Sequence, residues 1–479
     1  MKNFQNEAAA VFRYFEKICA IPHGSCDMQA ISDYCVNFAG ENGLPAVTDG
    51  AKNVVIYKPG TEGYENAEPI ILQGHLDMVC QKTEDSDTDF KKDGVKTYTD
   101  GDFIKAKGTT LGADNGIAVA MIMAVLASRD LKHPPIEAVF TTDEEIGMVG
   151  AKELDCSILK GKRMINLDSE EAGVLTVSCA GGSDFKFFLP TEKRTVRGTK
   201  ISLEIGGLKG GHSGVDIDKH RINANILMGR ILHSAKNAGD FHIIKINGGT
   251  KGNAIPFCCK AELVAEDSES FINAMQRSIS AVKAEIGYRE DACSIALRAE
   301  ATGDFEVFTP YVRDKLLYML LTTPNGVVDM SAEIDGLVET SLNLGILMTD
   351  DDGIVMQYAL RSNKTSALTF LEDRMTEFAR YNGCESQISC RYEPWEYKKD
   401  SALRNLYAGA FFEKLGRKPK IAAIHAGLEC AVFTQKIEGL DCISVGPDMF
   451  DVHTVNEKLS ISSATETFEL LCEVLERCK

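Results

Sequence analysis

Residues 69–79 read PIILQGHLDMV, an apolar run that ends in a histidine and an aspartate. An apolar helical stretch, NGIAVAMIMAVLASRD, follows at 115–130, and the runs IEAVFTTDEE (136–145) and KRMINLD (162–168) again end in acidic residues. Short apolar runs that alternate with helical stretches are typical of a largely parallel, doubly wound sheet. We therefore predict an α/β domain that collects polar groups at the carboxyl ends of its strands.

The pattern changes at about residue 186. A strand–helix–strand–strand–helix–strand set covers residues 199–301, with its first helix at 222–239, and a second set covers 311–395. These sets predict an inserted α+β domain built from a duplicated ferredoxin-like unit. We expect one discontinuous α/β domain, residues 1–185 and 397–479, interrupted by an inserted domain of residues 186–396.

Composition limits the partners and the compartment. With 52 Lys plus Arg against 70 Asp plus Glu, the net charge of −18 disfavours nucleic acid and anionic membrane surfaces. The apolar run 116–127 is too short to cross a bilayer, and residues 1–22 are typical of an amphipathic helix rather than a signal peptide. Fifteen scattered cysteines without a C-x-x-C pair indicate reduced thiols, so we expect a cytoplasmic protein.

Several acidic and imidazole side chains follow predicted strands or open the buried helix. They are His75, Asp77, Asp114, Glu144, Glu145, Asp168 and His453. Each alone has an ordinary interpretation, as a turn former, a helix cap or a hydrogen-bonded core histidine. Two histidines with several carboxylates at one sheet edge form a ligand set suited to Zn²⁺ and related ions, which makes a two-metal hydrolytic site one interpretation.

Other catalytic motifs are absent from the sequence. There is no H-E-x-x-H, no G-x-x-x-x-G-K-[ST] and no G-x-S-x-G, and the run 211–214, GHSG, is one residue too short for the last of these.

The motifs GHLDMV, LGADNG, TTDEEIG, INLDS and DVHT, in this order, resemble the co-catalytic zinc peptidase superfamily that includes aminoacylase and carnosinase. Within it, GGHSG, GNAIP, HAGLEC and SVGPD are similar to the bacterial aminoacyl-histidine dipeptidases. The resemblance spans residues 74–455 and implies a catalytic domain with an inserted lid domain. It also implies two divalent metal ions, Zn²⁺ first and Mn²⁺ or Co²⁺ as alternatives.

The resemblance assigns roles to single residues. The implied metal ligands are His75, Asp114, Glu145, Asp168 and His453, with Asp114 bridging both ions through a segment whose Asp114–Asn115 peptide is cis. The implied catalytic residues are Asp77, which orients the His75 ring, and Glu144, the general base. The implied substrate-binding residues are His212, Asn253, Arg361, His425 and Gly427. Ordinary interpretations stay open for three of these residues: His212 as a loop residue, Asn253 as a turn former and Arg361 as part of a surface ion pair.

The function that follows from the resemblance is hydrolysis of unblocked dipeptides, with Xaa-His dipeptides such as β-alanyl-histidine as candidates. A deacylase of N-acyl amino acids and a catalytically silent binding protein are the alternatives. The expected partner is the dipeptide substrate, and the resemblance also allows a homodimer.

Overall fold

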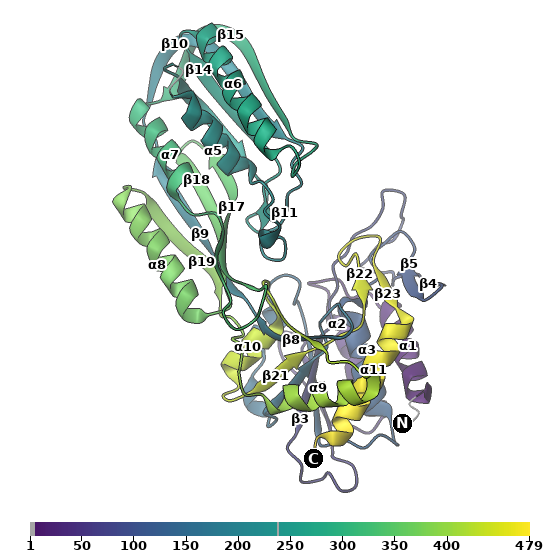
Figure 1. The fold of residues 1–479 in the computed structure, drawn as a ribbon. Coiled ribbons are helices and arrows are strands. Elements are labelled where there is room, and N and C mark those ends of the chain that lie inside the picture. The colour runs from purple at the N-terminus through teal and green to yellow at the C-terminus, as the bar shows by residue number, and fades with distance from the viewer. Residues whose placement is uncertain (1–4, 237–238) are drawn as a thin grey trace. The chain divides into compact units, whose positions relative to one another are not determined.

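The computed structural model describes residues 5–236 and 239–479 and divides into two compact units (Figure 1). Unit 1 comprises Met1–Cys179, Trp395–Ala423 and Leu428–Lys479, and unit 2 comprises Ala180–Pro394 and Ile424–Gly427. Two predicted helices, at 1–22 and 222–239, include residues 1–4 and 237–238, which lie outside the described residues. Among the described residues, no helix is both long and apolar enough to cross a membrane.

Unit 1 is built on an eight-stranded sheet with strand order β1-β2-β6-β3-β7-β21-β8-β20. Its strands are β1 (Ala46–Thr48), β2 (Val54–Lys58), β3 (Ile70–His75), β6 (Ile136–Thr141), β7 (Arg163–Asn166), β8 (Val174–Cys179), β20 (Lys420–Ile424) and β21 (Asp441–Ser444). The central strands β6, β3, β7 and β21 are parallel, while β1, β2 and β8 run antiparallel to their neighbours. The α/β prediction is confirmed, and the sheet is mixed at both sides of its parallel centre.

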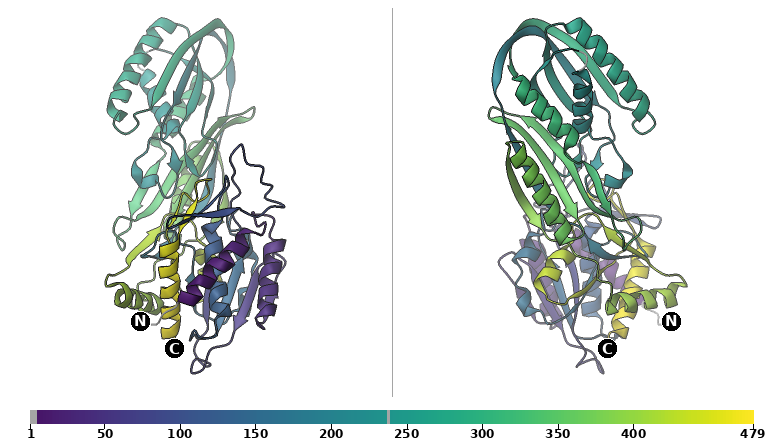
Figure 2. Two further views of the ribbon diagram at one scale, coloured as in Figure 1. Left: turned by 90° about the vertical axis from the view of Figure 1, so that its right-hand side faces the viewer. Right: turned by 60° about the vertical axis from the view of Figure 1, so that its left-hand side comes forward.

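The helices of unit 1 pack on this sheet and on one another (Figures 1 and 2). They are α1 (Gln5–Cys19), α2 (Gln29–Glu41), α3 (Ala113–Ala127), α4 (Val149–Glu153), a 3-10 turn (Cys156–Ile158), α9 (Ala402–Leu415), α10 (Glu429–Lys436) and α11 (Ile461–Arg477). Helix α3 is buried on every side from Ala113 to Leu126, because it lies between β3 and the helices α1 and α11. Its continuous apolar sequence therefore reflects full burial in a core.

A small four-stranded sheet completes unit 1, in the order β22-β23-β5-β4. Its strands are β4 (Thr97–Asp100), β5 (Phe103–Ala106), β22 (Met449–Phe450) and β23 (Lys458–Ser460). The loop between β22 and β23 carries His453.

Unit 2 holds one nine-stranded antiparallel sheet, with the path β15-β10-β14-β12-β17-β18-β9-β19 and β16 paired to β17. Its elements are β9 (Gly181–Pro190), β10 (Lys193–Gly206), β11 (Gly211–His212), a 3-10 turn (Ile217–Lys219), α5 (Ala224–Ala235), β12 (His242–Gly248), β13 (Ala254–Ile255), β14 (Cys259–Ala265), α6 (Ser268–Ile286), β15 (Ser294–Phe308), α7 (Pro310–Thr322), β16 (Gly326–Met330), β17 (Val338–Thr349), β18 (Gly353–Ser362), α8 (Thr365–Tyr381) and β19 (Glu385–Tyr392). The helices α5 to α8 form one layer on this sheet (Figures 1 and 2).

The strand order shows the duplicated ferredoxin-like unit directly. β10-α5-β12-β14-α6-β15 forms the first copy, and β9-α7-β17-β18-α8-β19 forms the second, each with the β-α-β-β-α-β order. The first copy is inserted between β9 and α7 of the second. Because β9 lies far ahead of the rest of its copy in the chain, the sequence pattern at 311–395 lacks its first strand.

The two copies meet where β12 lies beside β17, and there the ladder has a single residue pair, Gly248 and Leu347. Side-chain amides supply further hydrogen bonds. Asn223 donates from Nδ2 to Asn343 Oδ1 and to the carbonyl of Leu344, both at 3.0 Å. Its Oδ1 accepts from the backbone N–H groups of Asn225 (2.9 Å) and Ile226 (3.2 Å), which caps α5.

We expect Asn223→Ala to lower the free energy of unfolding by about 2–4 kcal/mol, because it removes a helix cap and takes away the donor to the buried Oδ1 of Asn343. Asn223→Ser keeps a capping oxygen and loses only the amide donors, so its loss should be smaller. Urea unfolding of both variants tests this. Equal losses of unfolding free energy in the two variants would show that the cap contributes nothing. An Ala variant as stable as the wild type would show that the Asn223 hydrogen bonds do not stabilise the fold.

Candidate metal centre

Three neighbouring parallel strands bring three of the predicted ligands, His75, Glu145 and Asp168, to one edge of the unit 1 sheet. His75 is the last residue of β3 and pairs in register with Thr141, the last residue of β6. Glu144 and Glu145 follow β6, and Asp168 follows β7, the other neighbour of β3. Because the carboxyl ends of parallel strands share an edge, these side chains converge although the chain separates them.

Asp114 lies between the two histidines. Its Oδ1 is 3.1 Å from His75 Nε2 and its Oδ2 is 3.1 Å from His453 Nε2. His75 Nε2 is also 3.5 Å from Asp168 Oδ1, and His453 Nε2 is 2.7 Å from Glu145 Oε1. One carboxylate thus has an oxygen in each of two donor groups, the arrangement that a bridging ligand requires.

The donor atoms form compact groups in which every ligand atom lies within 4.8 Å of the others. These groups are His75, Asp114, Asp168; Asp114, Glu145, His453; and His75, Glu144, Glu145. His75 Nδ1 lies 3.0 Å from the carbonyl oxygen of Asp77 and can only donate to it, so the lone pair of Nε2 faces carboxylate oxygens. Acceptors that face one another need a positive charge between them, and the residues therefore fit divalent cations.

The carboxylate of Asp77 connects the ends of β3 and β6. Its Oδ1 lies 3.4 Å from His75 Nδ1 and accepts from the backbone N–H of Glu144 at 2.9 Å. Its Oδ2 accepts from the Ser25 hydroxyl at 2.8 Å and from the Glu145 N–H at 3.3 Å. Asp77 is buried and belongs to none of the three donor groups. Its carboxylate instead contacts the His75 ring and the backbone N–H groups of the two glutamates.

Asn115 and Glu457 hold the start of α3, and no sequence motif singles out either residue. The Asp114–Asn115 peptide is cis, as the resemblance implied. Asn115 Oδ1 accepts from the His75 N–H at 3.2 Å and Nδ2 donates to the Leu167 carbonyl at 3.0 Å, which ties α3 to β3 and to the segment after β7. The carboxylate of Glu457 accepts from four successive backbone N–H groups at the N-terminus of α3, residues 111–114, at 2.7–3.4 Å.

Burial and mutual repulsion change the acidity of these groups. Burial raises the pKa of Asp168 to about 6, and the His75 ring limits the rise. Burial, together with Asp168 and Glu429, also holds the pKa of Glu144 well above its usual range, although His75 opposes this. The hydrogen bonds that the protonated His453 ring donates to Asp114 and Glu145 raise the pKa of His453 to about 11. A carboxyl group with a raised pKa is suited to accept and return a proton.

Residues 71–477 match the family described as Peptidase family M20/M25/M40. The chain belongs to this peptidase family. The resemblance to the zinc peptidase superfamily is thereby confirmed, and the M20 match covers both parts of unit 1 that carry metal-ligand candidates.

Two relatives cover almost the whole M20 chain. A protein of Escherichia coli (strain K12) named cytosol non-specific dipeptidase is 36% identical over 469 residues, 96% of each chain. The crystal structure of an aminoacylhistidine dipeptidase from Vibrio alginolyticus is 37% identical, covers 98% of this chain and 96% of that one, and has a TM-score of 0.88. An aminopeptidase from Bacillus cereus, 16% identical with a TM-score of 0.57, shares the fold.

The predicted substrate-binding residues lie in unit 2 of this M20 chain. His212 is in β11, Arg361 is in β18, and His425 and Gly427 are in the segment 424–427. Asn253 precedes β13, the partner of β11, and its carbonyl accepts from the Ser213 N–H at 2.9 Å. Burial is the first cause of the lowered pKa values of His212 and His425, and the positive charge of Arg361 is the second. These three side chains therefore lie near one another.

A buried carboxylate of the HAGLEC motif, Glu429, contacts the strands that carry the candidate metal ligands. Glu429 Oε2 accepts from Gln73 Nε2 at 2.5 Å and from the Thr141 hydroxyl at 2.6 Å, and burial raises its pKa to about 7. Asn166 Nδ2 donates to Gln73 Oε1 at 2.6 Å. This chain of hydrogen bonds joins the ends of β3, β6 and β7.

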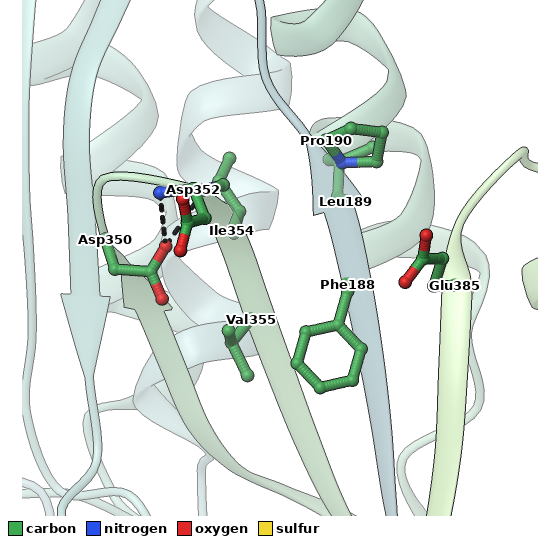
Figure 3. A pocket seen from close by; sticks show the side chains of 9 residues that line it. Phe188, Leu189, Pro190, Asp350, Asp352, Ile354, Val355 and Glu385 are labelled. Carbon is green, nitrogen blue, oxygen red and sulfur yellow. Dashed lines mark hydrogen bonds between the residues drawn. The ribbon is translucent and has the colours of Figure 1, made fainter.

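A pocket of about 290 Å³ in unit 2 contains none of the predicted site residues (Figure 3). It is lined by Phe188, Leu189, Pro190, Asp350, Asp352, Gly353, Ile354, Val355 and Glu385. Asp350 Oδ1 accepts from the N–H groups of Asp352 (3.0 Å) and Gly353 (2.9 Å), so this carboxylate stabilises the turn between β17 and β18.

We expect Gly74→Ala to disturb the metal centre, because its Cβ would lie 2.6 Å from Asn115 Oδ1 and 2.9 Å from the Cβ of Ala118. The variant should lose about 1–3 kcal/mol of stability and part of its metal. Gly409→Ala in α9 is the matched control, since a Cβ there meets nothing within 4 Å, and it should stabilise by about 0.5–1 kcal/mol. Urea unfolding and metal analysis compare the two, and identical behaviour would contradict the role of Gly74.

Proposed function

We propose that the protein is a cytoplasmic dinuclear metallodipeptidase that hydrolyses unblocked dipeptides, Xaa-His dipeptides such as β-alanyl-histidine included. The observation that carries the proposal is Asp114, whose two oxygens belong to two separate groups of candidate metal ligands. The names of the relatives, cytosol non-specific dipeptidase and aminoacylhistidine dipeptidase, support the substrate class.

In this proposal the five ligands divide between two ions. His75 and Asp168 would hold one ion, Glu145 and His453 the other, and Asp114 would bridge them. The donor set suits Zn²⁺, and Mn²⁺ or Co²⁺ would also fit. When bound, such ions polarise the scissile carbonyl and acidify a water molecule.

Glu144 performs the proton transfers in this proposal. Its carboxylate takes a proton from the attacking water and returns it to the nitrogen of the leaving amine. Asp77 fixes the backbone of Glu144 through the 2.9 Å hydrogen bond to its N–H, which holds the carboxylate beside the candidate ligands. Burial is the first cause of the raised pKa of Glu144, and the raised pKa makes the carboxylate a stronger base toward the attacking water.

Arg361 is the proposed binding group for the substrate's C-terminal carboxylate. Its Nη1 donates to the Tyr392 hydroxyl at 3.0 Å, whereas its buried Nε has no hydrogen-bond partner among the residues that the structure describes. A guanidinium with free donors binds a carboxylate through two parallel hydrogen bonds. His212 is proposed to donate to the scissile carbonyl, and Asn253, His425 and Gly427 to bind the substrate.

Paired substitutions test the division of roles between the two glutamates. Glu144→Gln should keep its metal while kcat falls about 10²–10⁴-fold, because the amide cannot accept the proton. Glu145→Gln removes an acidic donor beside His453, so metal content should fall. Metal analysis and dipeptide kinetics measure both. Equal metal loss in the two variants would contradict the assignment.

The dipeptidase proposal also predicts a requirement for a free carboxylate at the substrate's C-terminus. A dipeptide should be hydrolysed well, and its C-terminal amide poorly, because the amide cannot form the charged pair with Arg361. Arg361→Ala should lower kcat/KM strongly for the dipeptide and little for the amide. Equal kcat/KM for the two substrates would exclude the Arg361 interaction, and faster turnover of N-acyl amino acids would favour a deacylase.

A further inference from the structure

We infer that His212 acts as a neutral imidazole with its single proton on Nε2, because the loop that carries it fixes Nδ1 as a hydrogen-bond acceptor. This inference deepens the proposed function and rests on it: it makes His212 a hydrogen-bond donor in the reaction and excludes it as a general base.

The acceptor role of Nδ1 follows from its two partners. The backbone N–H of Gly214 lies 3.1 Å from His212 Nδ1, and that of Val215 lies 3.2 Å from the same atom. A backbone N–H can only donate, so Nδ1 must present its lone pair to both. A neutral imidazole carries one N–H, which is then on Nε2. Within the described part of the chain, Nε2 has no hydrogen-bond partner and its proton is available to a ligand.

Two carboxylates keep these amides in place. Asp216 Oδ2 accepts from the His212 N–H at 2.8 Å and from Arg221 Nη1 at 3.2 Å, which closes the turn around the ring. The buried Glu290 accepts from the N–H groups of Lys209 (2.8 Å) and Ile222 (3.1 Å), the two ends of the same loop. The loop is therefore fixed at its ends and within its turn.

The GGHSG motif is explained by the same packing. A Cβ on Gly214 would lie 2.2 Å from the carbonyl oxygen of His425 and 3.0 Å from Cε1 of the His212 ring. Gly211 has φ +143° and a Cβ there would lie 2.0 Å from Arg221 Nη1. Glycine at 214 allows the backbone to approach the ring closely enough for its amides to reach Nδ1, and glycine at 211 leaves room for the Arg221 and Asp216 side chains that close the turn.

Three charged or titratable groups lie around the His212 ring, and they differ in their effect on its pKa. They are Arg361 from β18, His425 from the segment 424–427, and Asp216 from the loop itself. Burial first, and then the positive charge of Arg361, lower the pKa of His212 to about 4, against the opposing effect of Asp216. The ring is thus neutral above about pH 4, and a proton added below that pH would occupy Nδ1 and break both amide contacts.

His425 provides an internal reference, because its surroundings require the opposite tautomer. Its Nδ1 lies 3.1 Å from Asn363 Oδ1, an acceptor, so Nδ1 carries the proton. Its Nε2 lies 2.7 Å from the Ser341 hydroxyl, which can donate to it. The two histidines should therefore give opposite nitrogen signals in one spectrum.

The direct test is NMR of the full-length, metal-loaded protein labelled with ¹⁵N-histidine. Long-range ¹H–¹⁵N correlations distinguish protonated from unprotonated ring nitrogens, and the variants His212→Gln and His425→Gln assign the signals. We expect an unprotonated Nδ1 and a protonated Nε2 for His212, unchanged between pH 8 and pH 5, and the reverse pattern for His425. A protonated Nδ1, or a ring that titrates near pH 6.5, would overturn the inference whatever the enzyme's substrate.

Kinetics of substituted enzymes test the consequence for the reaction. Removing a carbonyl-binding donor costs about 10²–10³-fold in kcat, which we expect for His212→Ala. His212→Gln keeps a side-chain N–H and should recover part of this loss in kcat with KM little changed, whereas His212→Glu offers only acceptors and should not. His220→Gln, the same substitution at an exposed position of the loop, is the control and should behave as wild type.

Recovery by His212→Glu instead of His212→Gln would identify a base and overturn the inference. Absence of any dipeptide turnover in the wild type would contradict the proposed function, while the NMR result would still decide the tautomer.

Discussion

Negative charge is concentrated at one edge of the unit 1 sheet, and the surrounding structure is arranged to hold it there. Among the described residues, the donor groups that contain Asp114, Glu144, Glu145 and Asp168 include two imidazoles, His75 and His453. Unit charges 4 Å apart repel by about 4 kcal/mol at the effective dielectric constant of a protein surface. Such a cluster needs counter-charge and rigid support, and both requirements determine which neighbouring residues the fold can use.

Backbone N–H groups supply much of the rigid support. Asp77 accepts from the N–H groups of Glu144 and Glu145, and Glu457 accepts from four N–H groups at the start of α3. Both carboxylates are buried and neither belongs to a donor group. They hold the segments that carry the ligands, so the ligand oxygens remain free for a cation. The Glu457 contact also links the loop of His453 to the helix of Asp114.

The sequence predicted the parts of this site that depend on local pattern. His75, Glu144 and Asp168 stand at the ends of apolar runs, and parallel strands bring such ends together, so their convergence follows from the fold class. Asn115 and Glu457 could not be found in this way, because their roles depend on contacts between segments up to 346 residues apart. A carboxylate that accepts hydrogen bonds from backbone N–H groups has no sequence pattern of its own.

The inserted domain shows the same limit at the level of topology. The order of strands and helices along the chain predicts the ferredoxin-like repeat but does not assign β9 to the second copy, because the whole first copy separates β9 from α7. Strand pairing supplies this information: β9 pairs with β18 over ten residues, from Gly181 with Ser362 to Pro190 with Gly353. Order along the chain cannot show which strands pair when one repeat is nested within another.

The histidines show most clearly what sequence leaves open. His75 has Nδ1 against the carbonyl of Asp77, so its Nε2 lone pair is free for a cation. In His212 the contacts are reversed, with N–H donors at Nδ1 and a proton on Nε2. His425 has both nitrogens occupied by Ser341 and Asn363. The same side chain can thus offer a lone pair to a cation, offer a proton to a ligand, or have both nitrogens engaged within the protein, and the group that faces Nδ1 decides which nitrogen carries the proton. That group is set by tertiary packing, and for His212 by the close approach of a backbone that only glycine permits.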